Sequence, residues 1–273
     1  HKEYRRQRQM CIRDSLVAGG GGIVTASSFP GGTSLSHLDV YADAAPDGIC
    51  GGSPHMHLVS TEAYVVISGE GALQTIDADG VRETTLTAGS VVWFTPGTIH
   101  RAVNRGDLRV VVLMSNAGLP EAGDAVLTFP SDVVSDPDAY AAAVSLGDDD
   151  GERAVRAGRR RDLAVTGFET LRDAVAAGDR TALTAFHDAA AALVLDRART
   201  WPDLVREGPL AQAEHSLALA EAVASGSVAH LADARVHRAA PSVGERAFGM
   251  CGRLRTYSAV SYTHLTLPTI LLV

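Results

Sequence analysis

Short runs in which apolar and polar residues alternate dominate the first half of the chain and predict β-strands. Successive side chains of a strand point to opposite faces, so each run has one face for a core and one for solvent. Such runs cover residues 35–41, 63–67, 72–76, 82–86, 91–94, 100–104 and 108–114. Turn residues separate them, including Gly69-Glu70-Gly71, which we expect to reverse the chain. Short strands at such regular spacing are typical of a sandwich or a barrel.

After about residue 130 the hydrophobic period lengthens and predicts helices. Asp136 and Pro137 provide the N-cap and the first position of a helix that runs to about residue 144. Three longer amphipathic stretches follow at about residues 152–177, 180–200 and 209–224. Residues 227–259 show no clear period and admit one more short helix before Pro241. We expect the helices to form an antiparallel hairpin or small bundle that packs against the β-rich half.

The two ends of the chain can be read as translations of the two opposite strands of one DNA element. Residues 10–14 can be encoded by ATGTGTATAAGAGAC, and the reverse complement of that DNA encodes the pentapeptide at residues 260–264. We therefore interpret residues 1–15 and 260–273 as translated sequencing adaptor. Lys2 is the only lysine, which agrees with a GC-rich gene that uses arginine elsewhere. The remaining chain divides into a β-rich part, residues 16–130, and a helical part, residues 131–259.

Three histidines and one glutamate in the β-rich part are spaced so that they can meet at one point. His55 and His57 are two positions apart, so their side chains share one face of a strand at a separation of about 6.6 Å. Glu62 opens the next apolar run, and His100 follows a turn that directs a new strand back towards the same interior. Three imidazoles and one carboxylate would then converge.

These residues resemble the two sequence motifs of the cupin superfamily. The spacing His55-x-His57-x4-Glu62-x6-Gly69 fits the first motif, although Gly48 lies one residue further from His55 than the motif requires. The resemblance covers roughly residues 34–115, and its opening glycine is not a ligand position.

The second cupin motif is matched by Gly89, Gly97, His100 and Asn104, although a threonine, Thr95, stands at a proline position of the motif. The resemblance implies a mainly β jelly-roll (cupin) barrel, to which the helical period adds an α-helical C-terminal region. It also implies one metal ion, for which the ligands would be His55, His57, Glu62 and His100.

Imidazole and carboxylate ligands together favour a divalent transition metal, namely Fe, Mn, Ni, Cu or Zn. Four protein ligands leave about two coordination positions for water or substrate. With one carboxylate ligand the site carries a charge of about +1, which favours an anionic small-molecule ligand with two oxygen donors. The alternative is a metal-free barrel whose interior histidines are satisfied by hydrogen bonds.

Strand alternation directs Tyr64, Gln74 and Asn104 towards the same interior, and these are the candidate substrate-pocket residues. Core packing is the simpler role for Tyr64. The sequence offers no general base beyond the ligands, so no catalytic residue is assigned. The leading hypothesis is a metal-dependent enzyme that acts on a small oxygen-rich molecule, either as a dioxygenase or as an isomerase or lyase. The alternative is a cupin that binds or senses a small molecule without catalysis.

Composition and charge exclude several classes of partner. The net charge is −8, and it becomes −11 without residues 1–15, which carry +3, so nucleic acids and anionic membranes are disfavoured. No apolar run reaches the roughly 18 residues of a membrane span. Three separated cysteines predict neither a disulfide framework nor a thiolate zinc site, and we expect a reducing cytoplasm. The run Arg159-Arg160-Arg161 is expected to be a solvated helix face. The sequence is compatible with a homodimer.

Overall fold

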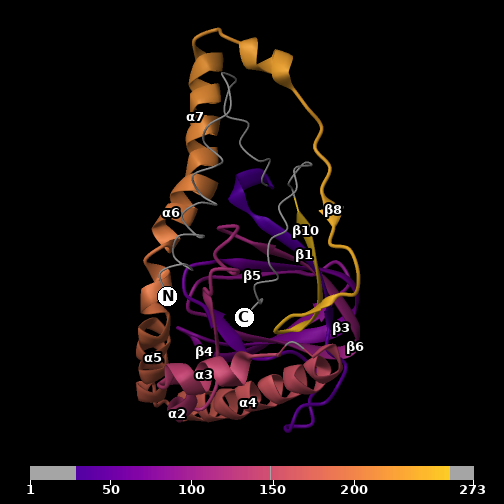
Figure 1. The fold of residues 1–273 in the computed structure, drawn as a ribbon, viewed down its shortest axis with the longest axis vertical. Helices are drawn as coiled ribbons and strands as arrows, with labels where there is room; N and C mark the ends of the chain where they lie inside the picture. Colours follow the sequence, from indigo (N-terminus) through magenta and orange to yellow (C-terminus); the bar gives the residue numbers. More distant parts are fainter. Residues whose placement is uncertain (1–28, 148, 259–273) are drawn as a thin grey trace.

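An antiparallel β-sheet and a layer of helices make up the computed structural model, which describes residues 29–147 and 149–258 (Figure 1). Residues 1–15 and 260–273, interpreted above as adaptor, lie outside the described residues. The elements are η1 (Pro30–Gly32), β1 (Ser34–Val40), β2 (His55–His57), β3 (Glu62–Asp77), β4 (Gly80–Thr87), β5 (Val91–Phe94), β6 (Ile99–Met114), β7 (Ala125–Leu127), α2 (Ser131–Val134), α3 (Pro137–Val144), α4 (Asp150–Ala176), α5 (Thr181–Ala198), α6 (Trp201–Val205), η2 (Arg206–Leu210), α7 (Ala211–Ala224), η3 (Ala229–Asp233), β8 (Ala240–Pro241), β9 (Ala247–Phe248) and β10 (Gly252–Ser258).

The sheet has the strand order β4-β3-β6-β1-β10-β8, with β2, β5, β7 and β9 paired to its side. The two 16-residue strands β3 and β6 pair along most of their length and are neighbours within the sheet. Among the described residues, the hydrogen-bonded order ends at β4 and β8 and does not close into a ring. The expected mainly β architecture with a helical C-terminal region is confirmed, with an open rather than a closed sheet.

The predicted chain reversal at Gly69-Glu70-Gly71 is wrong, because β3 continues through these residues. The β3–β6 register shifts between Val66 and Gly71, which marks β-bulges that bend the strand without ending it. Glycine is required here: a Cβ atom on Gly69 would lie 2.2 Å from Asp107 O, and one on Gly71 would lie 2.1 Å from Val103 O. The glycines thus permit the backbones of β3 and β6 to approach each other closely where the sequence suggested a turn.

The helical predictions agree well with the structure. Asp136 caps α3 by accepting hydrogen bonds from the backbone N–H groups of Asp138 and Ala139. Helices α4, α5 and α7 occupy the three predicted amphipathic stretches, and α3 to α5 form a layer beside the sheet (Figure 1). Within the described part of the chain, none of the helices combines the length and the apolar character that a bilayer crossing requires.

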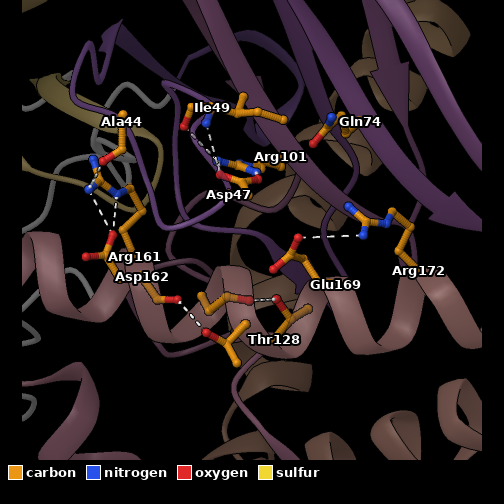
Figure 2. A network of polar contacts seen from close by, with 12 residues as sticks. Ala44, Asp47, Ile49, Gln74, Arg101, Thr128, Arg161, Asp162, Glu169 and Arg172 are labelled. Atoms are coloured by element: carbon orange, nitrogen blue, oxygen red, sulfur yellow. Dashed lines mark hydrogen bonds and ion pairs between the residues drawn. The ribbon is translucent and has the colours of Figure 1, made fainter.

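Helix α4 packs directly on β7 and on the residues that follow it. Gly167 faces the backbone of β7 and its continuation so closely that a Cβ atom would lie 2.1 Å from Thr128 O. Thr128 Oγ1 donates a hydrogen bond of 2.9 Å to Ala164 O, and Figure 2 shows Thr128 beside α4. The apolar cluster between sheet and helices includes Met56 of β2 and Phe168 of α4, so the back of the histidine strand lies on the helical layer.

The expectation of a solvated arginine run on α4 is wrong for two of its three members. Arg160 and Arg161 are only 1% and 6% exposed, whereas Arg159 is exposed. Arg161 donates to the backbone oxygens of Asp43 and Ala44 on the loop before β2 (Figure 2). These guanidinium groups satisfy backbone carbonyls, which charge counting along the sequence does not reveal.

The last part of the region expected to be helical is different in the structure. Residues 240–258 form β8, β9 and β10, and β10 pairs with β1 so that Thr256 lies opposite Ser36. Two-residue alternation in the segment from Leu254 to Thr256 is the sequence signal for this strand. Before it, α7 extends away from the sheet and the chain returns along the other side to β8 (Figure 1).

Candidate metal centre

The four candidate ligands meet in one buried group. His55 and His57 come from β2, Glu62 opens β3 and His100 lies near the start of β6. One ligand atom from each residue lies within 4.8 Å of those of the others, and none of the four residues is more than 5% exposed. His55 lies directly opposite His100 in the β2–β6 pair, which explains why two ligands distant in sequence share one point.

Hydrogen bonds at Nδ1 orient the rings of His55 and His100. His55 Nδ1 lies 2.9 Å from Ser53 O, and His100 Nδ1 lies 3.1 Å from Thr98 O. A carbonyl oxygen only accepts, so Nδ1 carries the proton and Nε2 keeps its lone pair for a metal.

Glu62 faces two of the imidazoles. Its Oε2 atom lies 3.1 Å from His57 Nε2 and 3.2 Å from His100 Nε2. Glu62 Oε2 and His100 Nε2 are nonetheless buried without a hydrogen bond of good geometry. Unsatisfied buried acceptor atoms that converge on one point fit a cation, because a metal would satisfy their lone pairs together.

A fifth residue, Asp124, supports the group and was not identified from the sequence. Its Oδ2 atom lies 3.5 Å from His57 Nδ1, and the residue is fully buried. Its carboxylate accepts hydrogen bonds from the backbone N–H groups of Leu58, Val59 and Ser60 at 2.8 to 3.0 Å. A carboxylate behind a ligand histidine orients the ring and raises its basicity. The sequence gives no signal for this residue beyond a turn at Gly123-Asp124.

Burial and charge set the protonation of the group. Burial, with the neighbouring His100 and His57 rings, lowers the pKa of His55 well below 6.5. Burial also acts to lower the pKa of His57, but the carboxylates of Asp124 and Glu62 outweigh it and raise this pKa to about 9. Burial would raise the pKa of Glu62, but His100 and His57 hold it below its usual range. A divalent ion would therefore replace a proton on His57.

A cavity of about 130 Å³ opens onto His55, His57 and Glu62. Its remaining walls come from β1, β6, the turn before Asp124 and the C-terminal strands. The C-terminal segment alone supplies Gly249, Met250, Cys251, Leu254, Thr256 and Tyr257. The cavity thus depends on residues far beyond the part of the chain that resembles a cupin.

Cys251 is a buried member of this wall. Its Sγ atom lies 3.8 Å from the Tyr64 hydroxyl and 4.0 Å from His55 Nδ1. Burial, together with the nearby Glu62 carboxylate, raises the pKa of this thiol to about 12, so it is protonated at neutral pH. Burial likewise raises the pKa of Tyr64 well above 10.

None of the three candidate pocket residues lines the cavity. Tyr64 shares the face of Glu62 but is fully buried, with its ring 5.3 Å from that of Phe94, and serves the core. Asn104 shares the parity of His100, yet its amide donates to Val40 O and its oxygen accepts from the backbone N–H groups of Gly106 and Leu108. It therefore holds the bend of β6.

Gln74 points away from the site because of strand parity. It lies opposite Arg101, whereas the neighbouring pair places Thr75 opposite His100. Gln74 donates to Glu83, and Figure 2 shows it with Arg101 on the side of the sheet that faces α4. The bulges before it made its face hard to predict from counting along the strand.

Comparison with known proteins supports the fold assignment. The family model described as "Cupin domain" matches residues 43–116, which contain all four candidate ligands. A search of curated proteins gives no match. Among solved structures, the capsular polysaccharide assembling protein of Staphylococcus aureus is 22% identical over 30% of this chain and 22% of its own, with a TM-score of 0.23.

Two smaller solved structures are also similar. The TDP-fucose-3,4-ketoisomerase of Campylobacter jejuni is 12% identical over 30% of this chain and 58% of its own, with a TM-score of 0.26. A cupin protein of Bacteroides fragilis is 22% identical over 30% of this chain and 60% of its own, with a TM-score of 0.21. The chain thus spans less than two thirds of each of these three proteins. The cupin family model thus matches residues 43–116 of this chain.

Proposed function

We propose that this chain is a metal-dependent enzyme that acts on a small oxygen-bearing molecule. One divalent transition metal, Fe, Mn, Ni, Cu or Zn, would be held by His55, His57, Glu62 and His100. The observation that carries the proposal is the convergence of these buried ligand atoms, two of them without a satisfactory hydrogen bond.

When bound, such a metal supplies Lewis acidity for a substrate oxygen and, if redox-active, reactivity towards O2. The protein's own residues prepare that chemistry. Ser53 O and Thr98 O fix the tautomers of His55 and His100, and Asp124 orients His57. The cavity reaches His55, His57 and Glu62, which are themselves buried. Dioxygenase chemistry and isomerase or lyase chemistry both fit this arrangement.

Metal analysis of the purified full chain tests the proposal. We expect about one transition metal ion per chain for the wild type and for His215→Ala, a control in the exposed face of α7. His55→Ala and His100→Ala should lose most of the metal. Equal metal content in the wild type and both site variants would refute the metal centre.

Catalysis needs a separate assay, because a binding or sensing protein would hold metal as well. One observation favours that alternative: the thiol of Cys251, which lines the cavity, is protonated at neutral pH and offers no general base. Oxygen uptake and product formation should be measured against diketones, catechols and hydroxy acids. Turnover that vanishes in His55→Ala supports an enzyme, whereas ligand binding without turnover supports the sensing alternative.

A further inference from the structure

We propose that the cavity above the metal centre selects a small substrate whose far end is cationic or neutral, and that Glu121 recognises this end. The substrate would have one anionic end for the metal and an apolar body. This inference rests on the proposed function, because the metal must bind the anionic end.

Among the described acidic and basic side chains, only acidic ones line the cavity, histidines apart. Its lining contains two carboxylates, Glu62 and Glu121, and neither a lysine nor an arginine is among the described residues that line it. A metal would therefore provide the one full positive charge that a ligand touches there. A second anionic group, such as a phosphate or a second carboxylate, would find no cationic partner and would face Glu121.

Two buried arginines near the cavity wall do not change this balance. Arg101 is paired with Asp47, so its charge is compensated. Arg160 donates from Nη2 to Gly249 O, and therefore lies behind the backbone of the wall. Neither arginine lines the cavity.

Burial distinguishes the floor of the cavity from its mouth. His55, His57 and Glu62 are at most 5% exposed, whereas Glu121 is exposed. The apolar lining residues Leu38, Val112 and Met114 are buried, while Ser34, Ser36 and Thr256 are half-buried. A ligand bound to the metal would thus extend past apolar side chains towards a polar rim that carries one carboxylate.

The backbone holds Glu121 in place, but its carboxylate is uncommitted. The flanking turn is fixed by hydrogen bonds from Ala122 N to Leu119 O at 3.0 Å and from Gly123 N to Pro120 O at 3.1 Å. Within residues 29–147 and 149–258, the Glu121 carboxylate forms neither a hydrogen bond nor an ion pair. The same turn leads to Asp124, so one loop carries the charge at the mouth and the support of His57.

The volume limits the size of the substrate. A cavity of about 130 Å³ is slightly smaller than the roughly 150 Å³ in which a benzene molecule is bound. The substrate body inside the cavity is therefore limited to about six non-hydrogen atoms, and larger molecules such as nucleotide sugars would leave most of their surface outside.

Three probes of equal length test the inference on the metal-loaded full chain. 4-Aminobutyrate, pentanoate and glutarate share a carboxylate and three methylene groups and differ only at the far end. Dissociation constants would be measured by titration of the cobalt-substituted protein, with metal content determined on the same samples. The variants are Glu121→Gln, Glu121→Lys and the control Glu207→Gln, an exposed glutamate outside the cavity.

We expect the wild type to bind 4-aminobutyrate tightest and glutarate weakest. Because Glu121 is exposed, each step should be roughly two- to fivefold. Glu121→Gln should abolish the advantage of 4-aminobutyrate over pentanoate, Glu121→Lys should favour glutarate, and Glu207→Gln should keep the wild-type order.

Glutarate binding as tight as that of 4-aminobutyrate, an order unaffected by both Glu121 variants, or no binding of any probe to metal-loaded protein would overturn the inference alone. Protein that takes up no metal would instead refute the proposed function and, with it, this inference.

Discussion

Asp124 supports His57 from behind, with its Oδ2 atom 3.5 Å from His57 Nδ1. Asp124→Asn keeps the shape of the side chain and an acceptor for the backbone N–H groups, but removes the charge behind the imidazole. We expect the metal affinity to fall roughly 10- to 100-fold. Competition with a chromogenic chelator measures this affinity, and Asp138→Asn on the exposed surface of α3 is the control. Unchanged affinity in Asp124→Asn would show that the carboxylate only organises the loop.

Two glycines of α4 make a matched pair for the packing of the helices on the sheet. Gly167→Ala places a methyl group 2.1 Å from Thr128 O and should cost about 1–3 kcal/mol of unfolding free energy. A Cβ atom added at Gly158 would point into open space. Gly158→Ala should therefore stabilise the protein by about 0.5–1 kcal/mol through helix propensity. Denaturant unfolding monitored by circular dichroism measures both. Equal effects of the two substitutions would mean that α4 does not lie against the strand.

The ion pair of Asp47 and Arg101 makes stability depend on pH in the acid range. Burial would raise the pKa of Asp47, but the hydrogen bond to Arg101 and the other contacts prevail and lower it below 3.8. The stabilisation is therefore complete above about pH 4 and is lost as the pH falls through the folded-state pKa. Asp47→Asn should cost about 1–3 kcal/mol at pH 7, because Arg101 loses a buried partner, and less at low pH.

The control for this pH effect is Asp79→Asn, which removes an exposed partner of Arg82. Its effect should be much smaller than that of Asp47→Asn at every pH, because solvent screens this exposed pair. Unfolding curves at several pH values between 2.5 and 7 give the comparison. A cost of Asp47→Asn that does not shrink in acid would contradict the assigned pKa direction.

Cys251 should resist alkylation in the folded protein, because its thiol is buried and has a pKa of about 12. The thiolate is the reactive form, and almost none exists at pH 8. Cys50 is partly exposed and serves as the internal reference. Peptide mass spectrometry after brief iodoacetamide treatment should find Cys50 modified and Cys251 modified only after denaturation. Equal labelling of both would show that the C-terminal wall opens readily.

The sequence identified the parts of the fold that local patterns control. Alternation located β1 and capping residues located α3. The spacing of the motifs predicted that His55, His57, Glu62 and His100 converge, and the structure brings these four residues together. The strand and capping signals depend on neighbours in sequence, and the four ligands follow from the match to the cupin motifs, so both are visible without a structure.

Other features depend on contacts between distant segments and were missed. The bulges at Gly69 and Gly71 arise from close approach to β6, and they obscured the orientation of Gln74. Asp124 reaches His57 only through the pairing of β2 with β7, which places His57 opposite Ala125. Nothing near Asp124 in the sequence indicates that partner.

The pairing of Ser36 with Thr256 makes one wall of the cavity a seam between the first and the last strand of the described chain. During synthesis on the ribosome, all four candidate ligands emerge long before Thr256 does. A chain whose strands pair in the order of their synthesis would therefore hold all four candidate ligands together while the cavity is still open on the side of β10. We expect metal to enter most easily at this stage, and its later exchange in the finished protein to be limited by local separation of β10 from β1.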